Sequence, residues 1–364
     1  MSPVIFNIPM NKTFQFGGFL VISAFLLAAC SNQSTPSANA IKPVLVTEPT
    51  KHDTDDPAIW IHPNDPARSL IVGTDKNIDG ALYVYDLEGK IQQDKVVSGI
   101  QRPNNVDIAY GLLVGTDTVD IAVTGERLTR KMRIFSLPDM QPLDGGGIPV
   151  FVGETGVEYR DLMGVALYTR PADGALFFII GRKTGPKEVY LWQYRLNGKA
   201  DGTVKAELVR KFGKYSGIKE IEAIAVDNEL GYIYYSDEGV GVRKYHADPA
   251  MGNEELALFA QEGFADDHEG ISIYKNEDDT GFILVSDQQA NEFHIYPREG
   301  STGNRHAHPL LKEVSVSTME SDGSDITSRP LGPDFPDGLF VAMSDDKTFH
   351  YYSPKAILDS LLVK

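Results

Sequence analysis

The chain has 364 residues, 42% of them hydrophobic, which is enough for one large globular domain or two medium ones. Its 34 lysines and arginines against 51 aspartates and glutamates give a formal net charge of −17, which argues against nucleic acid or an anionic membrane surface as a partner and favours cations. A single cysteine excludes a disulfide framework and a cysteine-ligated zinc site.

The N-terminal segment has the pattern of an export signal. Lys12 precedes an apolar stretch over residues 13–29, and this stretch runs into Leu-Ala-Ala-Cys at residues 27–30. The ending resembles a bacterial lipoprotein box, in which the cysteine is acylated, so we expect residues 1–30 to be a signal peptide and Cys30 to carry lipid. A plain secretory signal that contains a cysteine by chance is the alternative.

The rest of the chain divides into a short tether and one long domain. Residues 31–42 are small and polar, which is typical of a flexible linker, and residues 43–364 are expected to form the mature domain. The sequence has no second apolar run long enough to span a membrane, so we expect the lipid to be the only membrane contact. The domain would then be exported and either anchored at the cell envelope, in an outer membrane, or released from the cell.

Within that domain, short alternating runs are separated by Gly, Asp, Asn and Pro, and an aromatic strand recurs six times. Its anchor positions are Tyr85, Phe135, Tyr194, Tyr245, Tyr296 and Tyr351. The steps between them are 50, 59, 51, 51 and 55 residues, and such a period with several strands each indicates propeller blades. We therefore predict an all-β fold, a single six-bladed β-propeller with about four antiparallel strands per blade. A β-sandwich with coincidental spacing is the alternative.

Polar residues flank the two inner strands of each predicted blade. Because these strands are antiparallel, residues before the first and after the second meet at one end, and six blades place them around one mouth of the central channel. Cations follow the second strands of the first three blades: Lys76, Arg127, Arg182 and Lys183. Carboxylates crowd the same ring: Asp55, Asp56, Glu222, Glu238, Asp267 and Glu269. We therefore predict a split mouth with a cationic arc and an acidic arc.

The two arcs predict what the mouth binds. Crowded carboxylates repel one another unless a cation compensates them, and hard oxygen ligands without a His or Cys pattern favour Ca²⁺. A cationic arc suits a polyanion that carries several phosphates. Solvated turn acids on an acidic surface are the alternative interpretation.

Two segments are expected to complete the ring. Residues 43–47 form an apolar run that can close it by joining the last blade, for which the sequence pattern identifies no inner strand. Residues 300–333 are expected to contain one outer strand, followed by an acidic loop that presents Asp322 and Asp325 to calcium.

Several of these motifs resemble those of the β-propeller phytase family. They include Asp-Asp-Pro-Ala-Ile-Trp at residues 55–60 and the segment Leu-Gly-Pro…Gly-Leu-Phe-Val-Ala within residues 331–342, and the likeness extends over residues 43–364. The resemblance implies a calcium-dependent phosphoric monoester hydrolase of the 3-phytase type. Such an enzyme is a monomer that binds several calcium ions and cleaves phytate (inositol hexakisphosphate) or other inositol polyphosphates.

Carried over by position, the resemblance also implies roles for single residues. Cleavage would involve Asp55, Glu222, Glu238 and Asp322. Calcium would be held by Asp55, Asp56, Glu222, Glu238, Asp267, Glu269, Gln288, Asp322 and the backbone carbonyls of Pro57 and Val106. Phosphates would be bound by Lys76, Asn104, Arg127 and Arg182 or its neighbour Lys183. The chain departs from the family where Met163 replaces a frequent aromatic residue and His52 a frequent acidic one.

The residues also suggest a mechanism. No Ser, Cys or His is placed as an obvious nucleophile, so our hypothesis is that metal-activated water attacks the phosphate directly while the cationic arc holds an adjacent phosphate. Two alternatives stay open: another calcium propeller hydrolase, such as a lactonase or phosphotriesterase, and a non-enzymatic surface propeller that binds a partner protein. The cations at Lys76, Arg127 and Arg182 argue against the first alternative, since a neutral substrate needs none.

Overall fold

The computed structural model describes Met1 and residues 35–362 of the chain. Apart from Met1, the signal peptide expected over residues 1–30 lies outside the described residues, as does Cys30, and both stay predictions. Among the residues that are described, no helix is both long and apolar enough to cross a membrane.

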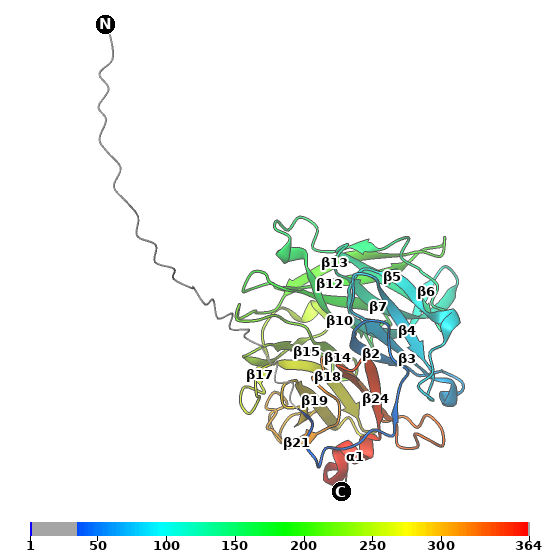
Figure 1. The fold of residues 1–364 in the computed structure, drawn as a ribbon. Helices are drawn as coiled ribbons and strands as arrows, with labels where there is room; N and C mark the ends of the chain where they lie inside the picture. Colours follow the sequence, from blue (N-terminus) through cyan, green and yellow to red (C-terminus); the bar gives the residue numbers. More distant parts are fainter. Residues whose placement is uncertain (2–34, 363–364) are drawn as a thin grey trace. The chain divides into compact units, whose positions relative to one another are not determined.

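Six four-stranded antiparallel sheets make up the fold (Figure 1). The first blade consists of β2 (Thr54–Trp60), β3 (Leu70–Asp75), β4 (Gly80–Tyr85) and β5 (Val97–Ile100). The second consists of β6 (Pro103–Val114), β7 (Asp117–Glu126), β8 (Lys131–Leu137) and β9 (Ile148–Pro149). The third consists of β10 (Leu162–Thr169), β11 (Leu176–Arg182), β12 (Leu191–Gly198) and β13 (Val204–Phe212).

The remaining blades follow the same order from the inside outward. The fourth consists of β14 (Ile224–Asp227), β15 (Tyr232–Asp237), β16 (Gly241–His246) and β17 (Ala257–Phe259). The fifth consists of β18 (His268–Lys275), β19 (Gly281–Asp287), β20 (Glu292–Pro297) and β21 (Lys312–Ser315). The sixth consists of β22 (Ser324–Thr327), β23 (Leu339–Ser344), β24 (Thr348–Tyr352) and β1 (Leu45–Val46). The helical segments are η1 (Pro66–Arg68), η2 (Gln93–Lys95), η3 (Glu158–Arg160), η4 (Pro249–Met251), α1 (Pro354–Leu358) and η5 (Asp359–Leu361).

The six sheets form a closed ring, as the repeat predicts. Each inner strand contacts the inner strand of the next blade, and β22 of the last blade contacts β2 of the first. All six aromatic anchor positions lie in the third strand of a blade, from Tyr85 in β4 to Tyr351 in β24. The predicted six-bladed propeller is therefore confirmed.

The N-terminal strand closes the ring. Leu45 in β1 pairs with Tyr351 in β24, so the first strand among the described residues becomes the outermost strand of the last blade. Upstream of it, Ile41 forms a parallel bridge with Val316 and Ala40 is buried. Contacts with the propeller thus begin inside the segment that the sequence predicts as a tether.

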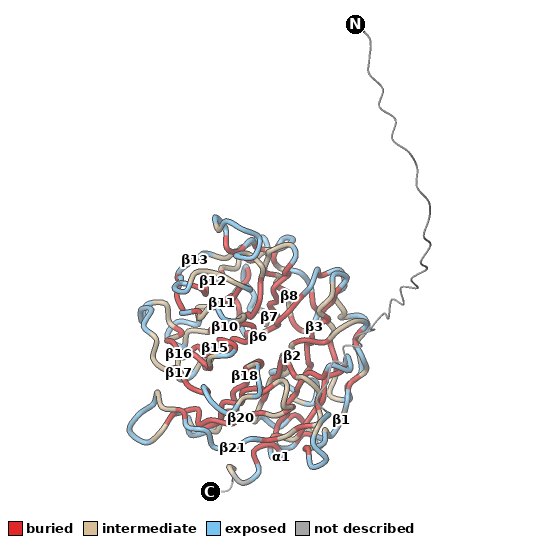
Figure 2. Tube along the Cα trace, turned by 60° about the vertical axis from the view of Figure 1, so that its left-hand side comes forward, coloured by how far each residue is buried: buried red, intermediate tan, exposed pale blue. Residues whose placement is uncertain are grey.

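The core lies between neighbouring blades, where the apolar faces of two sheets meet. Between the second and third blades, for example, Met132 and Ile134 pack in one cluster with Val165 and Phe178. Buried positions therefore follow the strands, and exposed positions gather in the connecting loops (Figure 2).

Short polar side chains connect the inner strands of different blades. An Asp107 carboxylate oxygen accepts the Leu167 N–H at 2.6 Å, and an Asp325 oxygen accepts the Ile59 N–H at 2.8 Å. The other Asp325 oxygen accepts the Ile326 N–H. Asp325 therefore lies within β22 and joins the last blade to the first, whereas the sequence suggested a loop that presents it to calcium.

Candidate active site

Four inner strands begin with a bulge that supplies side chains to one mouth of the channel. The regular pairing of β2, β6, β10 and β18 with their neighbours is interrupted by one extra residue near the start of each strand. Two residues lie inside each interruption: Asp55 and Asp56, Asn104 and Asn105, Met163 and Gly164, and Glu269 and Gly270. Bulges redirect side chains in this way near functional sites. They explain why the short motifs of the sequence meet at one end.

Glycine at two of these bulges lets the next blade approach closely. A Cβ atom on Gly164 would lie 2.0 Å from the carbonyl oxygen of Glu222, and one on Gly270 would lie 2.9 Å from that of Asp322. Only a glycine permits these backbone contacts. The backbone of both predicted site residues is thereby held against the preceding blade.

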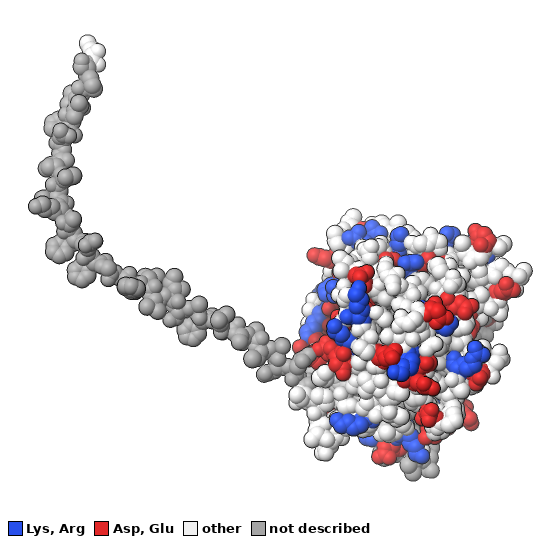
Figure 3. Space-filling view, turned by 45° about the vertical axis from the view of Figure 1, so that its right-hand side comes forward, with Lys and Arg blue, Asp and Glu red and all other residues white. Residues whose placement is uncertain are grey.

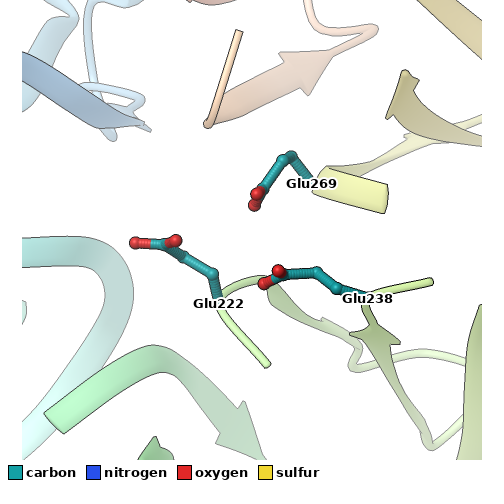
Figure 4. A group of neighbouring side chains, drawn as sticks. All are labelled: Glu222, Glu238 and Glu269. Atoms are coloured by element: carbon teal, nitrogen blue, oxygen red, sulfur yellow. The ribbon is translucent and has the colours of Figure 1, made fainter. Parts of the chain in front are cut away.

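Three glutamates converge at the mouth. Glu222 precedes β14, Glu238 follows β15, and Glu269 lies in β18, and Figure 4 shows the three side chains meeting from these separate segments. One carboxylate oxygen of each lies within 4.8 Å of those of the other two. All three side chains are buried.

Two of these glutamates have a buried oxygen that no hydrogen bond from the described residues satisfies. Within residues 35–362, Glu238 Oε1 and Glu269 Oε2 are buried and have no hydrogen-bond partner, whereas Glu222 Oε1 accepts the Asn104 amide at 2.9 Å. Burial and the charges of Glu222 and Glu220 raise the pKa of Glu238 to about 9. Burial and the neighbouring glutamates also raise the pKa of Glu269 well above its usual range. Unsatisfied buried oxygens of this kind fit a cation with oxygen ligands.

Lys76 lies beside this group and carries two carboxylate partners. Its ammonium is 2.8 Å from Asp55 Oδ1 and 3.0 Å from Asp322 Oδ2. Burial opposes its charge, but Asp55, Asp322 and Glu222 outweigh that effect and raise the pKa of Lys76. The structure thus joins the first and last blades through a lysine that stays protonated, while Asp55 Oδ2 is another buried oxygen with no partner among the described residues.

Two further predicted calcium ligands are engaged by protein groups. Asp267 contacts the Lys219 ammonium, and its Oδ2 accepts the Gln289 amide at 2.9 Å. The Gln288 amide donates to Asp322 Oδ1, and the Gln288 oxygen accepts from Gln289 at 2.7 Å.

The remaining predicted ligands surround the channel further in. Asp56 Oδ2 accepts the N–H of Val106 at 3.1 Å, and burial raises the pKa of Asp56 well above its usual range. Asp56, Pro57 and Val106 line a channel cavity of about 280 Å³ together with Asn105 and Asp107. The structure therefore brings these three predicted ligands together.

The cationic arc is less free than the sequence suggests. Arg127 forms a bidentate pair with Asp161, and Lys183 lies 2.9 Å from Glu220. Arg182 is fully buried, pairs with Glu154 at 3.1 Å, and lies over the Phe151 ring. Charges of both signs are also interspersed on the face that Figure 3 shows. The expected separation into a cationic arc and an acidic arc is therefore incomplete, because each of these cations has an acidic partner.

Comparison with known proteins identifies the family of this chain. A family model described as "Phytase" matches residues 19–351. This chain belongs to the phytase family. It is also similar to the 3-phytase of Bacillus subtilis (strain 168), with 29% identity over 302 residues, which cover 80% of this chain and 74% of the relative.

Family membership confirms the predicted enzyme class, a phytase that hydrolyses phytate. It also decides against the lactonase or phosphotriesterase alternative and against a non-enzymatic binding propeller. The structure also places the two residues that depart from the family pattern. Met163 is buried inside the bulge at the start of β10, and His52 is partly buried two residues before β2.

Sequence reasoning missed several residues of this phytase mouth. Asp161 stands one residue before β10, Lys219 lies three residues before the predicted ligand Glu222, and Gln289 follows the predicted ligand Gln288. Their signal is that an ionisable or amide residue flanks an inner strand.

Proposed function

We propose that this phytase hydrolyses phosphomonoesters of phytate with calcium bound at Glu222, Glu238 and Glu269. The observation that carries the proposal is the pair of buried glutamate oxygens without a partner among the described residues. Carboxylate oxygens without His or Cys ligands suit Ca²⁺ better than a transition metal. When bound, calcium supplies positive charge that polarises a phosphate group and activates water.

Residues of the first three blades would bind and orient the substrate. Lys76 is protonated and can donate to a phosphate oxygen beside the glutamates. Arg127 retains N–H groups that Asp161 does not use, and the Lys183 side chain is 46% exposed whereas that of Arg182 is 0% exposed. We therefore assign the third phosphate contact to Lys183, and we assign Arg182 to holding the loop that carries Glu154.

Further calcium ions are proposed at two places. Asp55 and Asp322 lie next to the glutamates and can extend that site. Asp267 and Gln288 would join it at its edge when their contacts with Lys219, Gln289 and Asp322 break. Asp56 with the carbonyls of Pro57 and Val106 would hold an ion in the channel.

The test is phosphate release from phytate in calcium, in excess chelator, and after calcium is restored. We expect activity in calcium, loss in chelator and recovery on restoration. Glu222→Gln should reduce turnover by more than about a hundredfold with the fold intact, because it removes one buried charge from the metal group. Glu207→Gln, an exposed residue on β13, is the matched control and should retain activity. Equal rates in calcium and chelator would contradict the calcium requirement.

A further inference from the structure

The guanidinium of Arg127 is held along one edge by a carboxylate from the next blade. Its Nε lies 2.7 Å from Asp161 Oδ1, and its Nη2 lies 2.9 Å from Asp161 Oδ2. Arg127 follows β7 of the second blade, and Asp161 precedes β10 of the third. The side chain of Arg127 is only 7% exposed. One edge of this arginine is therefore fixed between two blades.

Asp161 is itself held by the backbone on both sides. Its N–H donates to the carbonyl of Glu158 at 3.2 Å, and this hydrogen bond caps the end of η3. Its own carbonyl accepts the N–H of Lys183 at 2.8 Å. The second contact joins the start of β10 to the end of β11. The Asp161 carboxylate thus projects from a backbone that the third blade fixes.

The pairing leaves part of the arginine available. A guanidinium has five N–H groups, and the bidentate pair uses one on Nε and one on Nη2. In the part of the chain that is described, Asp161 supplies the side-chain hydrogen bonds of Arg127, so three N–H groups on Nη1 and Nη2 remain. They lie along the edges of the fork that Asp161 does not contact. Such a fork matches two phosphate oxygens.

We propose that Asp161 is a positioning residue, which holds Arg127 so that its remaining N–H groups meet a phosphate group of the substrate. The inference rests on the proposed function, because it needs a substrate with phosphates next to the cleaved one. A free arginine loses rotamer entropy when it is ordered, and an arginine that is already held avoids most of that cost when it binds. Asp161 therefore strengthens anion binding although it is itself an anion.

A second ion pair of the same shape serves as the control. Arg170 Nε and Nη2 contact Asp173 Oδ1 and Oδ2 at 2.9 and 2.7 Å. This pair lies at the turn between β10 and β11, at the end of the blade away from the mouth. Loss of Asp173 removes the same interaction without touching the site.

The experiment compares Asp161→Ala, Asp161→Asn and Asp173→Ala in the full chain. Calorimetry measures the Kd for inositol hexasulfate, a polyanion that is not hydrolysed as a phosphate ester, and steady-state kinetics with phytate gives KM and kcat separately. We expect Asp161→Ala to weaken hexasulfate binding about tenfold and to raise KM by a similar factor, with a smaller change in kcat. Asp161→Asn keeps one acceptor oxygen and the side-chain shape, so its loss should be intermediate. Asp173→Ala should match the unchanged chain.

The outcomes separate this inference from the proposed function. Unchanged or tighter hexasulfate binding by both Asp161 variants would overturn the positioning role, and tighter binding would show that Asp161 competes with the anion. If the unchanged chain binds hexasulfate but releases no phosphate from phytate, the proposed function fails while the binding comparison still decides the role of Asp161. If the unchanged chain releases phosphate from phytate in calcium but does not bind hexasulfate, the positioning role is overturned while the proposed function stands. Because Asp161→Asn conserves shape, it keeps the test decisive should Asp161→Ala unfold.

Discussion

At the scale of single residues, a lysine and a histidine are buried together away from the mouth, and burial lowers the pKa of the lysine, Lys244, to about 7. The ammonium of Lys244 is fully buried, donates to the Arg305 carbonyl at 2.7 Å, and lies 3.1 Å from His308 Nε2. His308 Nδ1 is 2.7 Å from the Pro297 carbonyl and must therefore carry the proton, which leaves Nε2 to accept from Lys244. Burial and the charge of Lys244 lower the pKa of His308 to about 4.

This arrangement predicts an acid-dependent loss of stability. The unfolded chain binds a proton at His308 below about pH 6.5, whereas the folded chain does so only below about pH 4. The unfolded state therefore binds more protons between these values, so the free energy of unfolding falls as the pH drops through this window, by up to about 3 kcal/mol. His308→Gln, which can still accept from Lys244, should flatten this fall. Denaturant unfolding of both proteins from pH 7.5 to pH 4 checks it, and parallel curves would contradict it.

At the scale of strands and blades, the sequence predicts the strands that carry a periodic apolar pattern. The third strands repeat because each carries an aromatic residue into a core between two blades. β22 was missed, since its four residues, Ser-Asp-Ile-Thr, show no apolar alternation and a long connection separates them from β23. The predicted convergence of Glu222, Glu238 and Glu269 is confirmed, because the antiparallel order of inner strands dictates it. The pairing of Arg127 with Asp161 could not be read from strand patterns, since it depends on side-chain reach between blades.

The bulge at the start of β10 predicts a strong effect from one methyl group. In Gly164→Ala the new Cβ would meet the Glu222 carbonyl oxygen at 2.0 Å, so the backbone of Glu222 must move. We expect the free energy of unfolding to fall by about 1–3 kcal/mol, as for overpacked cores, together with a loss of phytate hydrolysis. Gly125→Ala in β7 is the matched control, because its Cβ would meet Leu162 at an ordinary 3.6 Å. Similar stability and activity for the two variants would show that the close approach at Gly164 does not position Glu222.

At the scale of the whole molecule, the ring is joined at the mouth as well as by the N-terminal strand. Side chains at the mouth connect neighbouring blades through Lys76 with Asp322, Arg127 with Asp161, Lys183 with Glu220, Lys219 with Asp267, and Gln288 with Asp322. The three glutamates interrupt this pattern with buried carboxyl groups that these contacts do not compensate, and burial and mutual repulsion raise the pKa of Glu238 to about 9. A ligand that binds at the mouth therefore acts on contacts between several blades at once.

These uncompensated glutamates predict that calcium stabilises the native ring. They also predict that loss of one glutamate raises the Tm without calcium and lowers it in saturating calcium. The unfolded chain does not assemble the three carboxylates, so an ion that binds only the native state stabilises it, by about 2.7 kcal/mol at a hundred times its Kd. In chelator the folded chain must hold Glu238 protonated well above the usual pKa of a glutamate, which costs free energy, and Glu238→Gln removes that cost, so its Tm should exceed that of the unchanged chain. In saturating calcium the order should invert, because the variant has lost a ligand. Thermal unfolding of both proteins in chelator and in a calcium series measures the crossing, with Glu207→Gln as the control that should follow the unchanged chain. A Tm that calcium leaves unchanged in the unaltered chain would contradict a metal site at these glutamates, since any native-state ligand must raise it.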